Sequence, residues 1–220
     1  MSHVSRLLLL ALLLCVARSA GAQTGTAATT PVAEPVSGVI VVDASTSADS
    51  LSGADGKRFR EAFARFAQAS GGRDEFTVVE VSTYASVSLD RTEDAAEVSK
   101  KLSRLFSSRE PAATSLFDGC ALALKKAAQG KYERRFILVL SDGVDTVSEL
   151  SLKEVEKLLK EGGVKLFAIE VESRDRVGNF DGGFRALEAL AKASGGAAYR
   201  QKKKGEFDPI LSSIREALRR

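Results

Sequence analysis

From residue 38 onward, short apolar runs alternate with longer stretches in which apolar residues recur at helical spacing. The apolar runs are four to eight residues long and rich in β-branched side chains. Runs of this kind predict strands that are buried on both faces of a sheet. They cover residues 39–42, 76–81, 136–140 and 164–171, with weaker candidates at 85–89 and 197–200.

The stretches between these runs predict helices. Phe59, Phe63 and Phe66 follow one another at intervals of four and three residues, and Gly71-Gly72 then provides a typical helix stop. Similar patterns predict helices over residues 95–105, 115–128, 152–160 and 185–193, and a last one over 209–218.

Alternating strands and helices predict an α/β fold with a doubly wound, mostly parallel central sheet and helices on both faces. Residues 76–89 contain two strands with no helix between them. This arrangement predicts a hairpin, and therefore one antiparallel edge strand.

The first 22 residues have the features of a secretory signal peptide. Arg6 precedes about eleven apolar residues, and Ala20-Gly21-Ala22 supplies small residues at the exit, so we expect cleavage after Ala22. The apolar run is shorter than the roughly 20 residues that span a bilayer, although an uncleaved N-terminal anchor remains an alternative. We therefore expect an exported protein, periplasmic or extracellular, with no transmembrane segment after cleavage.

Cleavage also changes the charge of the chain. The 32 Lys and Arg residues include Arg6 and Arg18, whose removal leaves 30 basic against 29 acidic residues, a net charge of +1. Charge therefore gives no support for a nucleic-acid partner. Residues 23–37 are small, polar and proline-containing, which predicts a flexible or extended lead-in. Residues 38–220 are expected to form the domain, monomeric on its own.

The cleaved chain offers little for catalysis. No histidine follows residue 22 and no G-x-S-x-G occurs, which excludes a Ser-His-Asp hydrolase. A phosphate-binding G-x-x-x-x-G-K-[ST] is also absent. Cys120 is the only remaining cysteine, so no intramolecular disulfide is possible, and its helical context predicts a buried thiol.

Oxygen-bearing side chains follow two of the predicted strands. Asp43, Ser45 and Ser47 alternate after the first run, and Asp142 follows the run at 136–140. In such folds, ligands bind at the carboxyl ends of the strands near the point where the strand order reverses. Carboxylate and hydroxyl oxygens suit Mg²⁺, with Mn²⁺ or Ca²⁺ as alternatives, whereas zinc or copper would favour imidazole or thiolate.

Three motifs together resemble the von Willebrand factor type A domain and its metal-ion-dependent adhesion site. They are the D-x-S-x-S at 43–47, a threonine in the stretch A-T-S-L-F-D-G at 113–119, and S-D-G at 141–143. The likeness runs from about Val36 to the C-terminus. Thr46 stands where the family often has glycine, and Ser141 stands where it often has threonine, but neither position supplies an essential ligand.

The resemblance implies a doubly wound, Rossmann-like fold and a ligand set for the cation. The implied ligands are the hydroxyls of Ser45, Ser47 and Thr114, with Asp43 and Asp142 binding directly or through water. One coordination position stays open, and in the family a carboxylate of the partner fills it. The resemblance therefore implies a secreted or periplasmic binding module that engages Glu or Asp of a protein partner through the metal.

Simpler interpretations exist for the same residues. Ser45 or Ser47 could cap a helix starting near Asp55, Thr114 could cap the helix from Ser115, and 141–143 could be an ordinary turn. Asp118 and Asp145 lie close in sequence to the ligand loops. They could support the metal ligands, but we expect them to be solvated acids of the loops. Alternatives for the whole chain are a scaffold of a cell-envelope complex, in which the metal only rigidifies loops, and a Mg²⁺-dependent hydrolase or phosphotransferase. The polar, glycine-rich loop at 173–184 is a candidate for choosing the partner.

Overall fold

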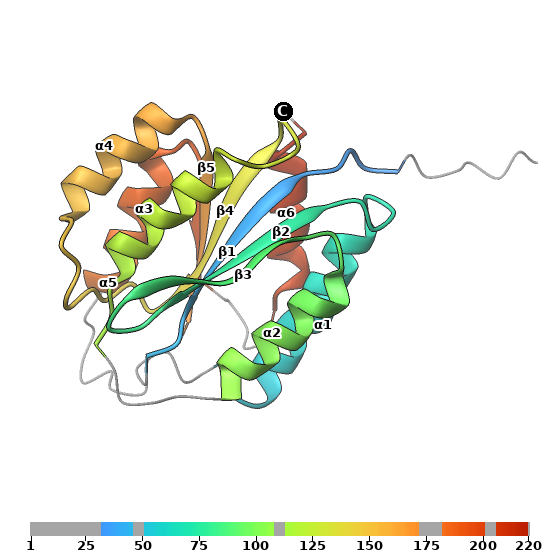
Figure 1. Cartoon of the computed structure of the whole chain (residues 1–220), viewed down its shortest axis with the longest axis horizontal. Coiled ribbons are helices and arrows are strands. Elements are labelled where there is room, and N and C mark those ends of the chain that lie inside the picture. The colour runs from blue at the N-terminus through green and yellow to red at the C-terminus, as the bar shows by residue number, and fades with distance from the viewer. Residues whose placement is uncertain (1–31, 46–50, 108–112, 172–181, 201–205, 220) are drawn as a thin grey trace, which may run out of the picture. The chain divides into compact units, whose positions relative to one another are not determined.

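A computed structural model describes residues 32–45, 51–107, 113–171, 182–200 and 206–219 of the chain (Figure 1). Within them, six strands form one sheet in the order β3-β2-β1-β4-β5-β6. The strands β2 and β3 pair antiparallel, and the other neighbours pair in parallel. Their bounds are β1 Ser37–Asp43, β2 Glu75–Val81, β3 Ala85–Thr92, β4 Arg135–Ser141, β5 Lys165–Glu170 and β6 Ala197–Tyr199.

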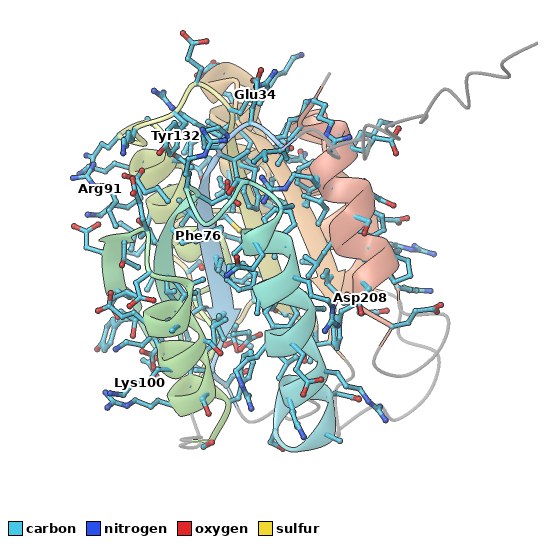
Figure 2. The ribbon with its side chains drawn as sticks, turned by 90° about the vertical axis from the view of Figure 1, so that its right-hand side faces the viewer. Glu34, Phe76, Arg91, Lys100, Tyr132 and Asp208 are labelled. Carbon is cyan, nitrogen blue, oxygen red and sulfur yellow. The ribbon has the colours of Figure 1, made fainter. Side chains whose placement is uncertain are left out.

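Helices cover both faces of the sheet (Figure 1). One face carries α1, α2 and α6 and the other carries α3, α4 and α5, each over its own buried apolar cluster. Figure 2 looks onto the face covered by α1, α2 and α6. The bounds are α1 Ala54–Gln68, α2 Ala95–Ser107, α3 Leu116–Ala127, α4 Leu152–Gly162, α5 Gly182–Ala193 and α6 Asp208–Ala217.

The sequence pattern explains both clusters. All seven residues of β1 are buried, as a strand between two helical layers requires. Alternate β1 residues enter opposite clusters, with Ile40 on the α1 side and Val41 on the α3 side. The phenylalanines of α1 pack against the strands, with the rings of Phe63 and Phe76 centred 4.8 Å apart. Aromatic edge contacts of this kind add to the stability gained from burial.

The predicted fold class is confirmed, including the antiparallel edge strand β3. Each predicted strand and helix is present, with ends that differ by a few residues. Cys120 is free and buried as predicted, and burial raises the pKa of its thiol to about 12. The predicted signal peptide, most of the lead-in and residues 173–181 of the loop predicted at 173–184 lie outside the described residues. The last three residues of that predicted loop belong to α5, which begins at Gly182.

The end of the predicted lead-in is packed against the domain. Val36 is buried, and its N–H donates to Asp74 Oδ1 at 3.0 Å, so residues before Gly38 also belong to the packed domain. None of the helices in the described part of the chain has the length and apolar character needed to cross a membrane.

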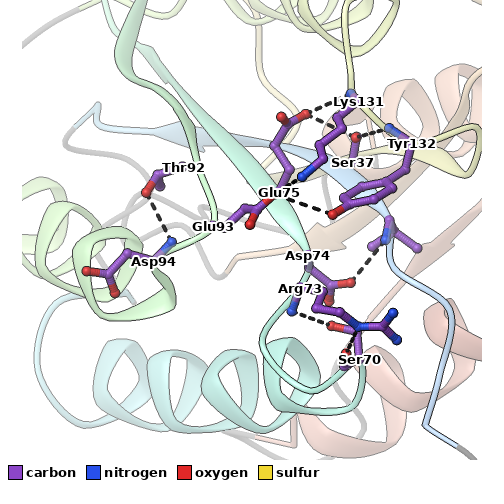
Figure 3. Close-up of polar contacts among 11 residues, drawn as sticks. Ser37, Ser70, Arg73, Asp74, Glu75, Thr92, Glu93, Asp94, Lys131 and Tyr132 are labelled. Atoms are coloured by element: carbon purple, nitrogen blue, oxygen red, sulfur yellow. Dashed lines mark hydrogen bonds and ion pairs between the residues drawn. The ribbon is translucent and has the colours of Figure 1, made fainter.

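At the amino edge of the parallel strands, polar groups pair with one another (Figure 3). Ser37 Oγ donates to Glu75 Oε1 at 3.0 Å and accepts from the N–H of Tyr132 at the same distance. The N–H of Lys131 also donates to Glu75 Oε1, at 3.0 Å. The side chains of Ser37 and Glu75 are thus satisfied by each other and by main-chain N–H groups.

Candidate functional site

The candidate site lies at the carboxyl edge of the sheet, between its two central strands. β1 ends at Asp43 and its neighbour β4 ends at Ser141. The last paired residues of the two strands are Val42 and Leu140, so the residues after them project from the same edge. β2 lies on one side of β1 and β4 on the other, so the strand order reverses here. This is where ligands bind in doubly wound sheets.

Hydroxyl groups hold the carboxylate of Asp43. Its Oδ1 accepts from the N–H and the Oγ of Ser45, at 3.0 and 2.6 Å, and its Oδ2 accepts from Ser141 Oγ at 2.6 Å. The residue is fully buried. Burial raises the pKa of Asp43 and the nearby charge of Asp142 raises it further, while the hydrogen bonds from Ser141 and Ser45 act in the opposite direction.

Asp142 has one satisfied and one unsatisfied carboxylate oxygen. Its Oδ1 accepts from the N–H of Val144 at 3.0 Å. Its Oδ2 is one of two buried side-chain polar atoms without a hydrogen-bond partner among the described residues; the other is Arg215 Nε. A buried carboxylate oxygen with no donor is costly, and buried charges are normally paired or bind a metal.

The turn after β4 fixes the position of Asp142. Gly143 has a φ of 81°, in the left-handed region that favours glycine. A Cβ at Gly143 would lie 2.1 Å from the carbonyl oxygen of Gly183, at the start of α5. Ser141 Oγ also accepts from the N–H of Gly143 at 3.0 Å, so one hydroxyl joins this turn to Asp43.

Thr114 lies in a loop that is hydrogen-bonded to its neighbours at this edge. Its N–H donates to Thr146 Oγ1 at 2.8 Å, and its carbonyl accepts from the N–H of Thr146 at 2.9 Å. The next residue, Ser115, donates its N–H and its Oγ to the carbonyl of Ser82, at 2.8 and 3.0 Å. The loops after β2, before α3 and after β4 are thereby joined through main-chain and hydroxyl groups.

Four of the five predicted ligands are buried at this edge: Asp43 as the last residue of β1, and Ser45, Thr114 and Asp142 in the loops. Ser47 lies outside the described residues. The capping interpretation is wrong for Ser45 and Thr114. The N-cap of α1 is Gly53 and that of α3 is Ser115, and neither makes a side-chain capping hydrogen bond.

Asp118 and Asp145 have structural roles that the sequence did not indicate. They were expected to be solvated loop acids, but both accept hydrogen bonds from main-chain N–H groups. Asp145 and Ser148 accept from the N–H of Phe117 in the first turn of α3, at 3.2 and 3.1 Å. In return, Asp118 accepts from the N–H groups of the two residues after Ser148, at 3.0 and 3.1 Å. These bonds fix the loop after β4 against α3. The bonded residues are about 30 positions apart in the sequence, so their pairing could not be predicted from it. The only signal in the sequence was the presence of an acid near each of the two loops.

The residues present fit a hard divalent cation. No group of three or more His, Cys, Asp or Glu side chains that could hold a metal occurs among the described residues. A cation at this edge would therefore depend on hydroxyl groups as well as on Asp43 and Asp142. Neutral oxygens together with two carboxylates match the preference of Mg²⁺ for oxygen ligands, and the unpartnered Oδ2 of Asp142 provides a binding atom.

We compared the chain with protein-family models, with curated proteins and with solved structures. The family model described as "von Willebrand factor type A domain" matches residues 39–211. No curated protein matches the chain.

Several solved structures are similar to this chain, at identities that show the fold alone. The conserved hypothetical protein BatB from Bacteroides thetaiotaomicron has a TM-score of 0.60 and 16% identity, over 84% of this chain and 98% of its own. The vWF domain of the type V pili tip protein Mfa5 from Porphyromonas gingivalis has a TM-score of 0.62 and 14% identity, over 86% and 98%. The pilus adhesin SpaC from Lactobacillus rhamnosus GG has a TM-score of 0.62 and 13% identity, over 86% and 30%.

Proposed function

The chain belongs to the von Willebrand factor type A domain family, and from that premise we propose that it is a non-enzymatic protein-binding module. Its site holds a divalent cation, Mg²⁺ or alternatively Mn²⁺ or Ca²⁺, and engages a Glu or Asp side chain of a protein partner. The module is exported and acts in the periplasm or outside the cell.

One observation carries this proposal: Oδ2 of Asp142 is buried without a hydrogen-bond partner among the described residues, near the buried carboxylate of Asp43. Two carboxylates in one buried region are unfavourable unless a positive charge joins them. The cation would be held by these two residues with hydroxyls of Ser45, Ser47 and Thr114. When bound, it supplies the positive charge that a carboxylate of the partner can ligate.

The hydrogen bonds between the loops favour a binding role over a purely structural one. Thr146 already joins the loop of Thr114 to the loop after β4, and Ser141, at the end of β4, joins that loop to Asp43 at the end of β1. A cation is therefore not needed merely to hold these three loops together. Two of the similar structures are described as a pilus tip protein and a pilus adhesin, which also supports an adhesive role.

Calorimetric titration with Mg²⁺ and then Mn²⁺ tests the proposal. We expect saturable binding to the wild type and none to Asp142→Ala, which lacks the unpartnered oxygen. The matched control is Asp90→Ala, because Asp90 lies on β3, where its half-exposed side chain pairs with Lys126. This variant should bind the cation like the wild type.

Two results would contradict the proposal. Binding that survives in Asp142→Ala would place the cation elsewhere on the chain. Absence of binding to the wild type with Mg²⁺, Mn²⁺ and Ca²⁺, even with acetate present to stand in for the carboxylate of the partner, would exclude a metal-bridged site.

A further inference from the structure

Exposed apolar side chains stand at the same edge of the sheet as the candidate cation site. We propose that Tyr84, Val144 and Val147 form an apolar rim that contacts the partner, so that the preferred partner presents an acidic residue flanked by apolar side chains. This inference rests on the proposed function and adds the chemical character of the partner to it.

The described part of the chain has five exposed large hydrophobic residues, and three of them lie at the carboxyl edge of the sheet. Val32 lies at the opposite edge, before β1, and Leu158 lies on α4. The other three follow β2 and β4 at the carboxyl edge, and Tyr84 is the most exposed of all five, at 80%. Single exposed apolar residues are ordinary, but several around one polar site indicate an interaction surface.

The two valines are attached to predicted ligands through their backbone. The N–H of Val144 donates to Asp142 Oδ1 at 3.0 Å. The N–H of Val147 donates to the carbonyl of Thr114 at 3.3 Å. The backbones of both valines are therefore held next to residues that would bind the cation, and both side chains are exposed to solvent there.

Tyr84 is presented on a fixed turn. The turn joins β2 to β3, and the N–H of Ser82 donates to the carbonyl of Tyr84 at 3.2 Å. Ser82 in turn accepts two hydrogen bonds from Ser115, the residue after Thr114. Figure 1 shows this turn and the carboxyl end of β1 at the same end of the sheet. Because its backbone is already ordered, Tyr84 can be buried by a partner at a small entropic cost.

The side-chain types indicate what the rim would recognise. Tyrosine is enriched among residues that dominate binding energy, because its rigid ring offers a large contact area. A carboxylate alone would leave this ring and the two valines in water. Apolar side chains next to the acidic residue would bury them and add affinity from the hydrophobic effect.

Two capped peptides test the inference: Gly-Phe-Glu-Leu-Gly, with apolar neighbours, and Gly-Ser-Glu-Ser-Gly, with polar ones. Their dissociation constants are measured by NMR titration of the Mg²⁺-loaded protein. We expect the wild type to bind the apolar peptide at least about fivefold more tightly. Tyr84→Ser should lose most of this preference, whereas Leu158→Ser, which removes an exposed apolar residue on α4, should keep it. Both variants should bind Mg²⁺ like the wild type.

The outcomes separate this inference from the proposed function. Equal affinity for the two peptides, a preference that survives in Tyr84→Ser, or no binding of either peptide at millimolar concentration would overturn the apolar rim. The proposed function stands in those cases if the titration still shows Mg²⁺ binding that depends on Asp142. Failure of the wild type to bind any divalent cation would instead overturn the proposed function, and the inference with it.

Discussion

Asp43 and Asp142 are both buried, but their hydrogen bonds differ. Both oxygens of Asp43 accept from neutral donors, whereas Oδ2 of Asp142 accepts from no donor in the described part of the chain. Hydroxyl and amide donors stabilise a carboxylate less than a cation does, and burial still raises the pKa of Asp43. The two acids therefore reduce stability in the absence of metal, as is common for groups retained for function.

Asp43→Asn tests whether this carboxylate reduces stability. At pH 7 without metal, we expect the substitution to raise the free energy of unfolding by about 1 kcal/mol, because it removes a buried charge. It should also abolish Mg²⁺ binding. Urea denaturation and calorimetry measure the two effects. Asp90→Asn is the control, since its exposed carboxylate should affect neither measurement, and a less stable Asp43→Asn would contradict the argument.

Gly143→Ala tests how closely the turn after β4 is fixed. The added Cβ would meet the carbonyl oxygen of Gly183 and would force a left-handed backbone on alanine. We expect a loss of about 2 kcal/mol in the free energy of unfolding and a 10- to 100-fold weaker Mg²⁺ affinity, because Asp142 is displaced.

Gly72→Ala is the matched control for that substitution. Gly72 has a φ of 75°, but a Cβ there would meet no atom of the described residues within 4 Å. This variant carries the backbone strain without the clash and without a link to the site. It should lose about 1 kcal/mol and keep its Mg²⁺ affinity. Equal Mg²⁺ affinity in the two variants would show that Asp142 does not depend on the contact with α5.

At the scale of elements, sequence periodicity was enough to place the strands and helices. The continuous apolar run at 39–42 and the spacing of Phe59, Phe63 and Phe66 each have one reasonable structural meaning, and β1 and α1 match it. The strand ends then placed Asp43 and Asp142 at one edge. The contacts between loops were not predictable, because Ser82 and Ser115 or Asp118 and Leu150 meet only when the whole sheet is assembled.

The burial of Arg215 in α6 could not be predicted from the sequence of that helix. The helical pattern predicted α6, but not that this charged residue would face inward. Its guanidinium pairs with Asp74, donates to the carbonyl of Phe66 at 2.6 Å, and lies 3.9 Å from the centre of the Phe66 ring. Asp74 also accepts from the N–H of Val36, so the pair joins α6 to α1 and to the start of the sheet.

Arg215→Met should destabilise the protein by about 3–5 kcal/mol, because it leaves the carboxylate of Asp74 buried without its cation. The double variant Arg215→Met with Asp74→Leu should recover a large part of this loss, since no charge then remains in the pocket. Denaturation of the wild type, both single variants and the double variant measures the coupling. Additive losses would mean that the pair does not act as a unit.

Across the whole molecule, the two edges of the sheet have different chemistry. At the amino edge, the side chains of Ser37 and Glu75 bond to each other and to the main-chain N–H groups of Lys131 and Tyr132 (Figure 3). The buried carboxylate of Asp74 there is neutralised by Arg215, whose Nε is the only buried side-chain polar atom at this edge without a partner among the described residues. At the carboxyl edge, two carboxylates lie close together, one of their oxygens finds no donor among the residues that the structure describes, and apolar side chains are exposed. The amino edge thus stabilises the fold, while the carboxyl edge retains the groups that a cation and a partner would satisfy.

This difference predicts that divalent cations stabilise the whole fold. Binding to the native state alone, at a concentration 100 times the dissociation constant, adds about 2.7 kcal/mol. For a chain of this size, each kcal/mol raises Tm by roughly 2–4 °C, so saturating Mg²⁺ should raise it by about 5–10 °C. Scanning calorimetry of the wild type and Asp142→Ala, with NaCl at matched ionic strength, separates specific binding from screening. A similar rise in both proteins would mean that Mg²⁺ acts elsewhere than on the unpartnered oxygen of Asp142.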